Sequence, residues 1–215
     1  GRAIRVLVEE RGVTGSFDFG DRDEFDFSNA DDYSKIDWTL YGTVINCGAY
    51  TAVNAAETPE GRKAAWTANA QGPALLAKVC AEYGITLAHV SSDYVFDGTE
   101  EKRSEGGSFN PLGVYGQTKA AGDIVVANCP RHYIVRPYGL ADRGNVGFVA
   151  KNGADDTSLT VGECSNEVSL RDRFDAPGIA RDVALKIFCL LGYRDGDVWP
   201  TSPKAFGTYN YVLAI

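Results

Sequence analysis

The sequence predicts an α/β fold in which a doubly wound, mainly parallel sheet carries helices on both faces. Short apolar runs alternate with longer amphipathic stretches, and Gly or Pro marks several of the boundaries. The chain has 215 residues, enough for one domain with a substantial core and a smaller second part. We expect the sheet domain to cover residues 1–136 and a smaller, incomplete C-terminal part to cover residues 137–215.

The first elements are clear in the pattern. Residues 43–49 form a short apolar run that ends in small residues, as a buried strand does. A helix is expected over 59–83, because Pro59 suits a first helical turn and Gly84 suits a stop. Residues 85–91 then predict the next strand.

The pattern continues and then weakens. Residues 115–127 predict a helix and 133–136 a strand, which completes the alternation typical of parallel sheets. Further on, 182–191 predicts a helix with an apolar stripe, and 208–215 predicts a strand. Ligands of such sheets bind outside the carboxyl ends of the strands, so functional residues are expected there.

Composition excludes several classes. Lys and Arg number 21 against 29 Asp and Glu, a net charge of −8, which argues against a nucleic-acid or anionic-membrane surface. No apolar run approaches the roughly 18 residues of a membrane span. The five cysteines are widely spaced and lack Cys-x-x-Cys, which favours reduced thiols in a cytoplasmic protein. His89 and His132 are interpreted as structural, and no metal site is expected.

Three residues fit the chemistry of carbonyl reduction. Tyr115 and Lys119 stand four apart, so a helix places them on one face, where the ammonium can lower the pKa of the phenol. Ser92 follows the 85–91 strand and could hold a carbonyl oxygen. Each has an ordinary alternative: a surface Tyr and Lys pair, and a turn-forming serine. The combination favours the catalytic interpretation.

Asp93 and Tyr94 are candidate contacts for substrate hydroxyls. They directly follow Ser92 at the expected edge of the sheet. A turn-capping aspartate and a half-buried tyrosine would explain them equally well.

Two further segments are candidates for a dinucleotide site. The small residues Cys47, Gly48 and Ala49 would let a ribose and pyrophosphate approach the backbone, although a tight turn also explains the glycine. Asp21 with Arg22 could bind an adenosine ribose or its 2′-phosphate, whereas charged loop residues are common without such a role.

These residues together resemble a known family, the dTDP-4-dehydrorhamnose reductases of the extended short-chain dehydrogenase/reductases. The resemblance covers about residues 1–145. It rests on the run Val-Ile-Asn-Cys-Gly-Ala-Tyr-Thr-Ala-Val at 44–53, Trp66 with Asn69, the block 91–98, and Tyr115 to Lys119 followed by Ala121, Gly122 and Asp123.

The resemblance implies a Rossmann-type fold, NADP(H) or NAD(H) as cofactor, and reduction of dTDP-4-dehydro-β-L-rhamnose at C4. It implies a catalytic triad of Ser92, Tyr115 and Lys119, with Tyr115 as the proton donor. The implied cofactor residues are Gly1, Asp21, Arg22, Asp26, Phe27, Cys47, Gly48, Ala49, Val90, Tyr115 and Lys119, and the implied substrate residues are Ser92, Asp93, Tyr94 and Tyr138.

Two departures keep alternatives open. The family begins with a strand and a glycine-rich loop, of which Gly1 resembles only the last glycine, so we expect that segment to precede Gly1. Residues 136–139 read Arg-Pro-Tyr-Gly, where the family has a tryptophan nearby. The function of another nucleotide-sugar reductase or epimerase is therefore an open alternative. A second alternative is an NADP-binding regulatory subunit like that of methionine adenosyltransferase. The protein could also form a homodimer. Arg22 leans toward NADPH.

Overall fold

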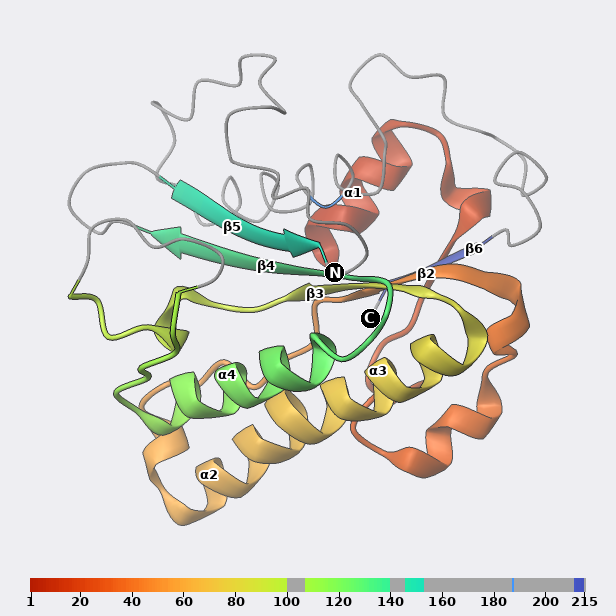
Figure 1. Ribbon diagram of the computed structural model, residues 1–215. Coiled ribbons are helices and arrows are strands. Elements are labelled where there is room, and N and C mark those ends of the chain that lie inside the picture. Colours follow the sequence, from red (N-terminus) through yellow and green to blue (C-terminus); the bar gives the residue numbers. More distant parts are fainter. Residues whose placement is uncertain (100–106, 140–145, 153–186, 188–210, 215) are drawn as a thin grey trace.

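The computed structural model describes residues 1–99, 107–139, 146–152, 187 and 211–214. Within these ranges, it describes the backbone alone for residues 137–139, 146–152 and 211–214. In this part of the chain helices cover both faces of one twisted sheet (Figure 1). The helices are α1 (Arg2–Glu10), α2 (Pro59–Trp66), α3 (Gly72–Tyr83) and α4 (Val114–Val126). The strands are β1 (Phe17–Phe19), β2 (Tyr41–Asn46), β3 (Thr86–Val90), β4 (His132–Gly139), β5 (Val146–Asn152) and β6 (Tyr211–Ala214).

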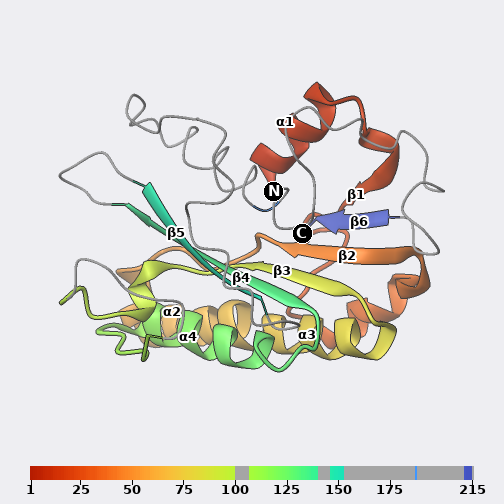
Figure 2. The ribbon, with the colours of Figure 1, turned by 45° about the horizontal axis from the view of Figure 1, so that its top comes forward.

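The sheet has the strand order β1-β6-β2-β3-β4-β5. All neighbouring pairs are parallel except β4 with β5, which is antiparallel. The view in Figure 2 shows α2, α3 and α4 together under one face and α1 above the other. The doubly wound fold expected from the sequence is therefore confirmed, with one antiparallel strand at the edge.

Alternation along the central strands builds two cores. In β2 the side chain of Val44 joins the core under α3, and the next residue, Ile45, joins the core under α1. Leu87 and Ala88 in β3 divide in the same way. All four are fully buried, as expected for a parallel sheet covered on both faces.

The helix expected over 59–83 is helical throughout and consists of α2, a π-helical turn and α3. It starts where predicted, with Thr58 as the N-cap accepting from the amide of Gly61, and Gly84 ends α3 at φ 68°. A π-helical turn, Thr67–Gln71, separates α2 from α3. Such turns occur often at functional sites, and this one directs a buried side chain described below.

The second half of the chain is described in part. The boundary expected at residue 136 falls inside β4, and β5 and β6 belong to the same sheet as β1 to β4. The two-part division of the chain stays a prediction. The helix expected over 182–191 lies outside the described residues except for the buried Ile187, and the strand expected over 208–215 is described as β6. No helix of the described part is long and apolar enough to cross a membrane.

Candidate active site

The predicted catalytic residues lie at the carboxyl edge of the sheet. Ser92 follows the end of β3, while Tyr115 and Lys119 lie in the first two turns of α4, which packs beneath the sheet (Figure 1). Cys47 and Gly48 follow the end of β2, the neighbouring strand. The topology thus brings together segments that are far apart in the sequence.

Ser92 begins a 3₁₀ turn, Asp93–Val95, and its side chain is held there. Its hydroxyl accepts from the amide of Tyr94 at 3.2 Å and donates to Asp93 Oδ1 at 3.2 Å. Ser92 therefore does form a turn, as its ordinary alternative predicted. Burial raises the pKa of Asp93, while the Ser92 hydroxyl and nearby amides oppose that rise.

Tyr115 is fixed by contacts on both sides of it along the chain. Glu57 Oε1 accepts from the amide of Val114 at 2.8 Å, which ties the start of α4 to the preceding 3₁₀ turn, Ala55–Glu57. The ring of Tyr115 meets the ring of Tyr94 edge-on, with 5.5 Å between centroids. Next to it, Gly116 allows close approach, since a Cβ there would lie 2.2 Å from the carbonyl oxygen of Tyr94.

The pKa of Tyr115 differs from the expectation. Burial raises it, the Ser92 hydroxyl opposes the rise, and the charges of Asp93 and Tyr94 add to it. The net direction is therefore upward, opposite to the lowering expected from the Tyr-x-x-x-Lys spacing, because burial outweighs the other influences. The described hydrogen bond of the Lys119 ammonium goes to the carbonyl of Val90 in β3. Tyr115 is accordingly a protonated phenol at neutral pH, the form that a proton donor requires.

Lys119 is 1% exposed, and Nζ donates to the carbonyl of Val90 at 2.8 Å. Burial lowers its pKa to about 8, and the negative charges of Asp123 and Cys47 act in the opposite direction. A surface lysine would have neither the burial nor the shift, so the surface alternative for this residue is excluded.

The site contains a residue to which we had given no role. Asn69, 1% exposed, projects from the π-helical turn. Its Oδ1 accepts from the amide of Tyr50 at 2.8 Å, and its Nδ2 donates to the carbonyl of Tyr50 at 3.1 Å. Nδ2 also donates to Thr118 Oγ1 at 3.1 Å. One amide thus joins the loop after β2 to the catalytic helix. The only signal for it in the sequence was its place in the resemblance.

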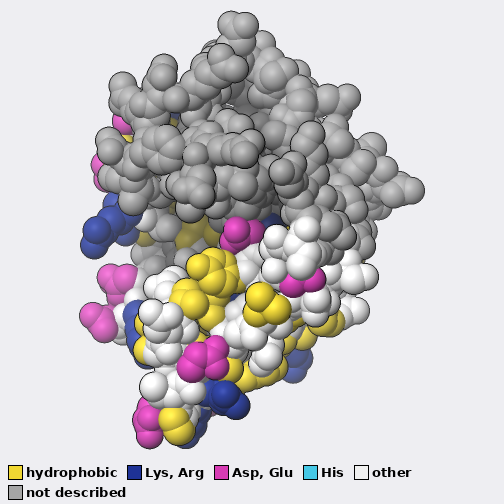
Figure 3. Space-filling model, turned by 90° about the vertical axis from the view of Figure 1, so that its left-hand side faces the viewer, with side chains coloured by type: hydrophobic (Ala, Val, Ile, Leu, Met, Phe, Trp, Pro, Cys, Tyr) yellow, Lys and Arg dark blue, Asp and Glu magenta, His cyan; other side chains and the backbone are white. Residues whose placement is uncertain are grey.

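A pocket of about 300 Å³ opens beside Tyr115. Its lining includes the acids Glu57, Asp93 and Asp97 and the exposed apolar surfaces of Tyr94 and Leu112. Figure 3 looks onto this side of the molecule, where hydrophobic and acidic side chains lie beside one another. The pocket is a candidate sugar site, because it combines apolar surface with acceptors for hydroxyl groups.

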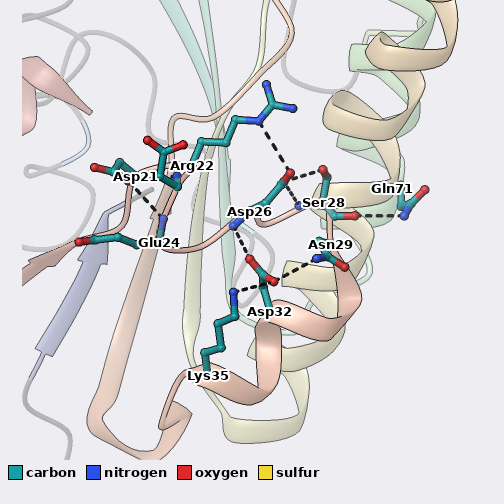
Figure 4. Close-up of polar contacts among 10 residues, drawn as sticks. Asp21, Arg22, Glu24, Asp26, Ser28, Asn29, Asp32, Lys35 and Gln71 are labelled. Atoms are coloured by element: carbon teal, nitrogen blue, oxygen red, sulfur yellow. Dashed lines mark hydrogen bonds and ion pairs between the residues drawn. The ribbon is translucent and has the colours of Figure 1, made fainter.

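The candidate ribose residues lie in an exposed loop after β1 (Figure 4). Asp26 Oδ1 accepts from the amide and the hydroxyl of Ser28, at 2.9 and 2.6 Å. Arg22 Nε lies 3.8 Å from Asp26 Oδ2, and its side chain is 89% exposed. Asp21 Oδ1 accepts from two backbone amides of its own turn. The turns of this loop are held by hydrogen bonds of its own side chains, and the largely exposed Arg22 side chain lies within ion-pair distance of Asp26.

Phe27 links this loop to the next strand end. A Cβ on Gly48 would lie 2.5 Å from its ring, and a Cβ on Gly72 would lie 2.4 Å from the opposite ring edge. The ring therefore fits between two glycines, at the first turn of α3 and after β2. Cys47, Gly48, Ala49 and Val90 are all partly exposed at the same edge. The Phe27 ring thus occupies the space that a side chain at position 48 or 72 would take.

The described contacts do not place two of the predicted residues, Gly1 and Tyr138, in this site. Gly1 is exposed and caps α1, with its carbonyl accepting from the amide of Arg5 at 3.1 Å. Tyr138 lies in β4 opposite Gly147, and its side chain is outside the described part of the chain. Both assignments stay predictions.

A parallel α/β sheet with a Ser, Tyr and Lys set at its carboxyl edge has the arrangement of a Rossmann-type oxidoreductase. The family model described as RmlD substrate binding domain matches residues 1–212. The chain belongs to this family, as the resemblance in the sequence indicated.

Individual relatives agree with the family. A dTDP-4-dehydrorhamnose reductase of Mycolicibacterium smegmatis is 44% identical over 165 residues, which is 73% of this chain and 46% of the relative. A dTDP-4-keto-6-deoxy-D-glucose reductase of Streptomyces niveus is 38% identical over 112 residues, which is 51% of this chain and 38% of the relative. The chain therefore spans less than half the length of these relatives.

Solved structures show the same fold. A dTDP-4-dehydrorhamnose reductase of Clostridium acetobutylicum has a TM-score of 0.57 and 34% identity, over 63% of this chain and 48% of that one. The enzyme of the same name from Bacillus anthracis, solved in complex with NADP, has a TM-score of 0.51 and 31% identity, over 54% and 42%.

Proposed function

We propose that the protein reduces the C4 ketone of dTDP-4-dehydro-β-L-rhamnose to give dTDP-L-rhamnose, with NADPH or NADH as the reductant. The observation that carries this proposal is that Ser92, Tyr115 and Lys119 lie at one edge of the sheet, where Tyr115 lines a pocket of about 300 Å³, in a chain of this family. The relatives bear the names of reductases of this substrate class.

The residues divide the chemistry between them. Ser92 would hold the ketone oxygen with its hydroxyl, which is fixed at the start of a turn. Tyr115, a protonated phenol at neutral pH, would give that oxygen its proton. The bound nicotinamide would supply the hydride. Lys119 would hold the nicotinamide ribose and stabilise the phenolate left on Tyr115.

The edge of the sheet fits a dinucleotide. The ring of Phe27 is held between Gly48 and Gly72, where it can form one wall of an adenosine site. Gly48, Ala49 and Val90 offer open backbone to the riboses. The exposed Arg22, beside Asp21, favours the 2′-phosphate of NADPH, and the solved relative from B. anthracis contains NADP.

The pocket beside Tyr115 is the proposed sugar site. Asp93 and Tyr94 would contact sugar hydroxyls there, and Tyr138 is proposed to close it from β4. We also propose a cytoplasmic location and leave a homodimer as a prediction.

The test is oxidation of the reduced nicotinamide by the full chain, with dTDP-4-dehydro-L-rhamnose generated in situ. Turnover is expected, and Tyr115→Phe should reduce it at least about a hundredfold while cofactor binding stays within about twofold, because the change removes the phenolic hydroxyl and keeps the ring. Near-normal turnover of Tyr115→Phe would contradict the proposed role of the tyrosine.

A second nucleotide sugar is the alternative that an observation favours. The segment 136–139 departs from the family pattern, and the S. niveus relative is named for a dTDP-4-keto-6-deoxy-D-glucose substrate. Turnover of that sugar nucleotide, with none of the rhamnose precursor, would move the proposal to it. Cofactor binding without turnover of either sugar would favour a non-catalytic regulatory subunit.

A further inference from the structure

A group of buried ionisable side chains lies behind the proposed active site. Lys119 and Asp123 of α4 are each 1% exposed, Arg136 of β4 is 3% exposed, and His89 of β3 is fully buried. Burying charged groups is costly unless they are paired. The arrangement of these four therefore needs an explanation, and the catalytic roles proposed above use only Lys119.

Asp123 and Arg136 form the pair. Arg136 Nε donates to Asp123 Oδ2 at 2.6 Å, and the guanidinium also lies over the ring of Phe109, 5.1 Å from its centroid. Arg136 is held from two sides, so it fixes the position of the carboxylate. Asp123 in turn cannot move toward another partner without breaking a short, buried, charge-assisted bond.

His89 adds no charge to the group. Asn46 Oδ1 accepts from the amide of Gly48, which leaves Nδ2 of Asn46 to donate to His89 Nδ1 at 3.1 Å. Burial holds the pKa of His89 well below its usual value, and the positive charges of Lys119 and Arg136 act in the same direction. The neutral ring turns Nε2 toward Asp123 Oδ1, 3.9 Å away. Burial raises the pKa of Asp123, and the charge of Arg136, the Ser91 hydroxyl and the bond to Arg136 oppose that rise. The short bond to Arg136 is what favours the carboxylate form, so Asp123 is the anion of the group.

Lys119 lies one helical turn before Asp123 but does not pair with it. The described hydrogen bond of its ammonium goes to the carbonyl of Val90, and no ion pair within 4.0 Å joins it to Asp123 in the described part of the chain. An ammonium has three donors, so this arrangement leaves donors for a ligand. A direct pair with Asp123 would have used one more of them.

The titratable and charged groups near Lys119 come from several elements. Asp123 lies on its own helix, Cys47 follows β2, His89 belongs to β3 and Arg136 to β4. Tyr115 precedes it by one turn, and the loop after β3 adds Asp93. Of the influences that keep the lysine protonated, Asp123 is the larger and Cys47 the smaller.

We propose that Asp123 is a positioning residue of the active site, whose carboxylate, held by Arg136, supplies the negative charge that keeps the buried Lys119 an ammonium without occupying its donors. The inference rests on the proposed reductase function, since the ammonium is needed there to hold ribose and stabilise phenolate. It adds a residue that touches neither substrate nor cofactor.

The first test follows Lys119 directly, by the pH dependence of its side-chain Cε signal in NMR spectra of the full chain. Lys119→Met assigns the signal. In the unmodified protein, Lys119 is expected to titrate near pH 8. In Asp123→Asn, an isosteric change, the titration should move to lower pH by about one unit or more, because a neighbouring negative charge is lost. Glu82→Gln removes an exposed charge on α3 and should leave it unchanged.

The second test is the pH profile of kcat/KM. Activity that needs the ammonium is lost as the pH rises through the pKa of Lys119. Asp123→Asn should therefore lose about tenfold at pH 8 relative to its activity at pH 6, and Asp123→Glu should restore most of the alkaline activity. A purely structural Asp123 would reduce activity equally at both pH values.

The outcomes separate the two proposals. Equal titration of Lys119 in Asp123→Asn and the unmodified chain would overturn the role of Asp123, whatever the turnover. A shifted titration without turnover of any sugar nucleotide would support Asp123 and contradict the reductase. Should Asp123→Asn fail to fold, the unmodified chain still decides: titration of Lys119 below pH 6 overturns the inference, and titration near pH 8 supports it.

Discussion

The amide of Asn69 makes three hydrogen bonds in the described structure, two to the backbone of Tyr50 and one to Thr118. Thr118 stands between Tyr115 and Lys119 and donates to the carbonyl of Tyr115 at 2.8 Å. The bonds therefore connect the loop after β2, where the cofactor is proposed to bind, with the helix that carries the proposed catalytic side chains. The buried Asn69 amide holds these two segments rigidly, because losing any of its bonds would leave a buried polar group without a partner.

Asn69→Ala should lower the free energy of unfolding by about 2–4 kcal/mol, since it unpairs two backbone groups of Tyr50 and one hydroxyl. Urea unfolding followed by circular dichroism measures this. Thr118→Val is the matched control: it breaks one of the three bonds and should cost about 1 kcal/mol. An Asn69→Ala protein as stable as Thr118→Val would show that the bonds to Tyr50 contribute nothing.

Residues differ in how far their roles can be predicted from sequence. Tyr115 and Lys119 lie one helical turn apart, so their spacing alone predicts a shared face. Asn69 acts over separations of 19 and 49 residues, and Asp123 acts through Arg136, 13 residues away on another element. The pKa of Tyr115 was misjudged for the same reason. It depends on burial and on Asp93, neither of which a local motif contains.

At the scale of elements, α4 is placed by its glycines. A Cβ on Gly116 would lie 2.2 Å from the carbonyl oxygen of Tyr94, and one on Gly122 would lie 2.2 Å from that of Asn69. The helix therefore lies against the turn after β3 on one side and the π-helical turn on another. These close approaches bring Tyr115 to Ser92, because the turn after β3 begins at Ser92.

Gly116→Ala tests this placement, because two principles give opposite expectations. Helix propensity alone would stabilise α4 by about 1 kcal/mol. The clash with backbone should instead destabilise the protein by about 1–3 kcal/mol and reduce turnover at least about tenfold, since Tyr115 moves away from Ser92. Thermal unfolding and turnover measure the two effects. Gly15→Ala, where a Cβ would meet nothing within 4 Å, is the control. A stabilised, active Gly116→Ala would show that α4 is free to shift.

The π-helical turn between α2 and α3 is a feature that periodicity does not reveal. The predicted helix start and stop were correct to the residue, because Thr58, Pro59 and Gly84 act locally. The turn Thr67–Gln71 carries the buried Asn69, whose partners lie 19 and 49 residues away. A local pattern contains neither partner, so it predicts a helix here but not the π turn.

At the scale of the whole molecule, the alternation of apolar runs predicted the fold class but not the strand order. β6 lies between β1 and β2, so its partners are far away in sequence: Phe17 pairs with Val212 and Tyr41 with Tyr211. β5 reverses direction and pairs with β4 along its whole length. Nothing in a local pattern specifies such pairings, because they depend on which edges remain free once the other strands have paired.

The stability of the whole molecule should depend on pH through His89. Its pKa in the folded protein is well below the usual 6.5, because burial and two nearby cations oppose protonation. The unfolded chain therefore binds a proton near pH 6 that the folded chain does not, and stability is lost as the pH falls below about 6.5, by up to about 1.4 kcal/mol per pH unit. Urea unfolding between pH 7 and pH 5 measures the slope.

A variant assigns that slope to the histidine. His89→Gln removes the titrating ring and keeps an amide that can pair with Asn46, so it should flatten the slope between pH 7 and pH 5, although packing losses lower its stability at every pH. Asp32 bears on the same measurement, because its pKa is lowered, chiefly by Lys35, and acidification weakens that pair only at lower pH. A slope near pH 6 that persists undiminished in His89→Gln would mean that another group takes up the proton on unfolding, and the pH dependence assigned to a neutral, buried His89 would have to be abandoned.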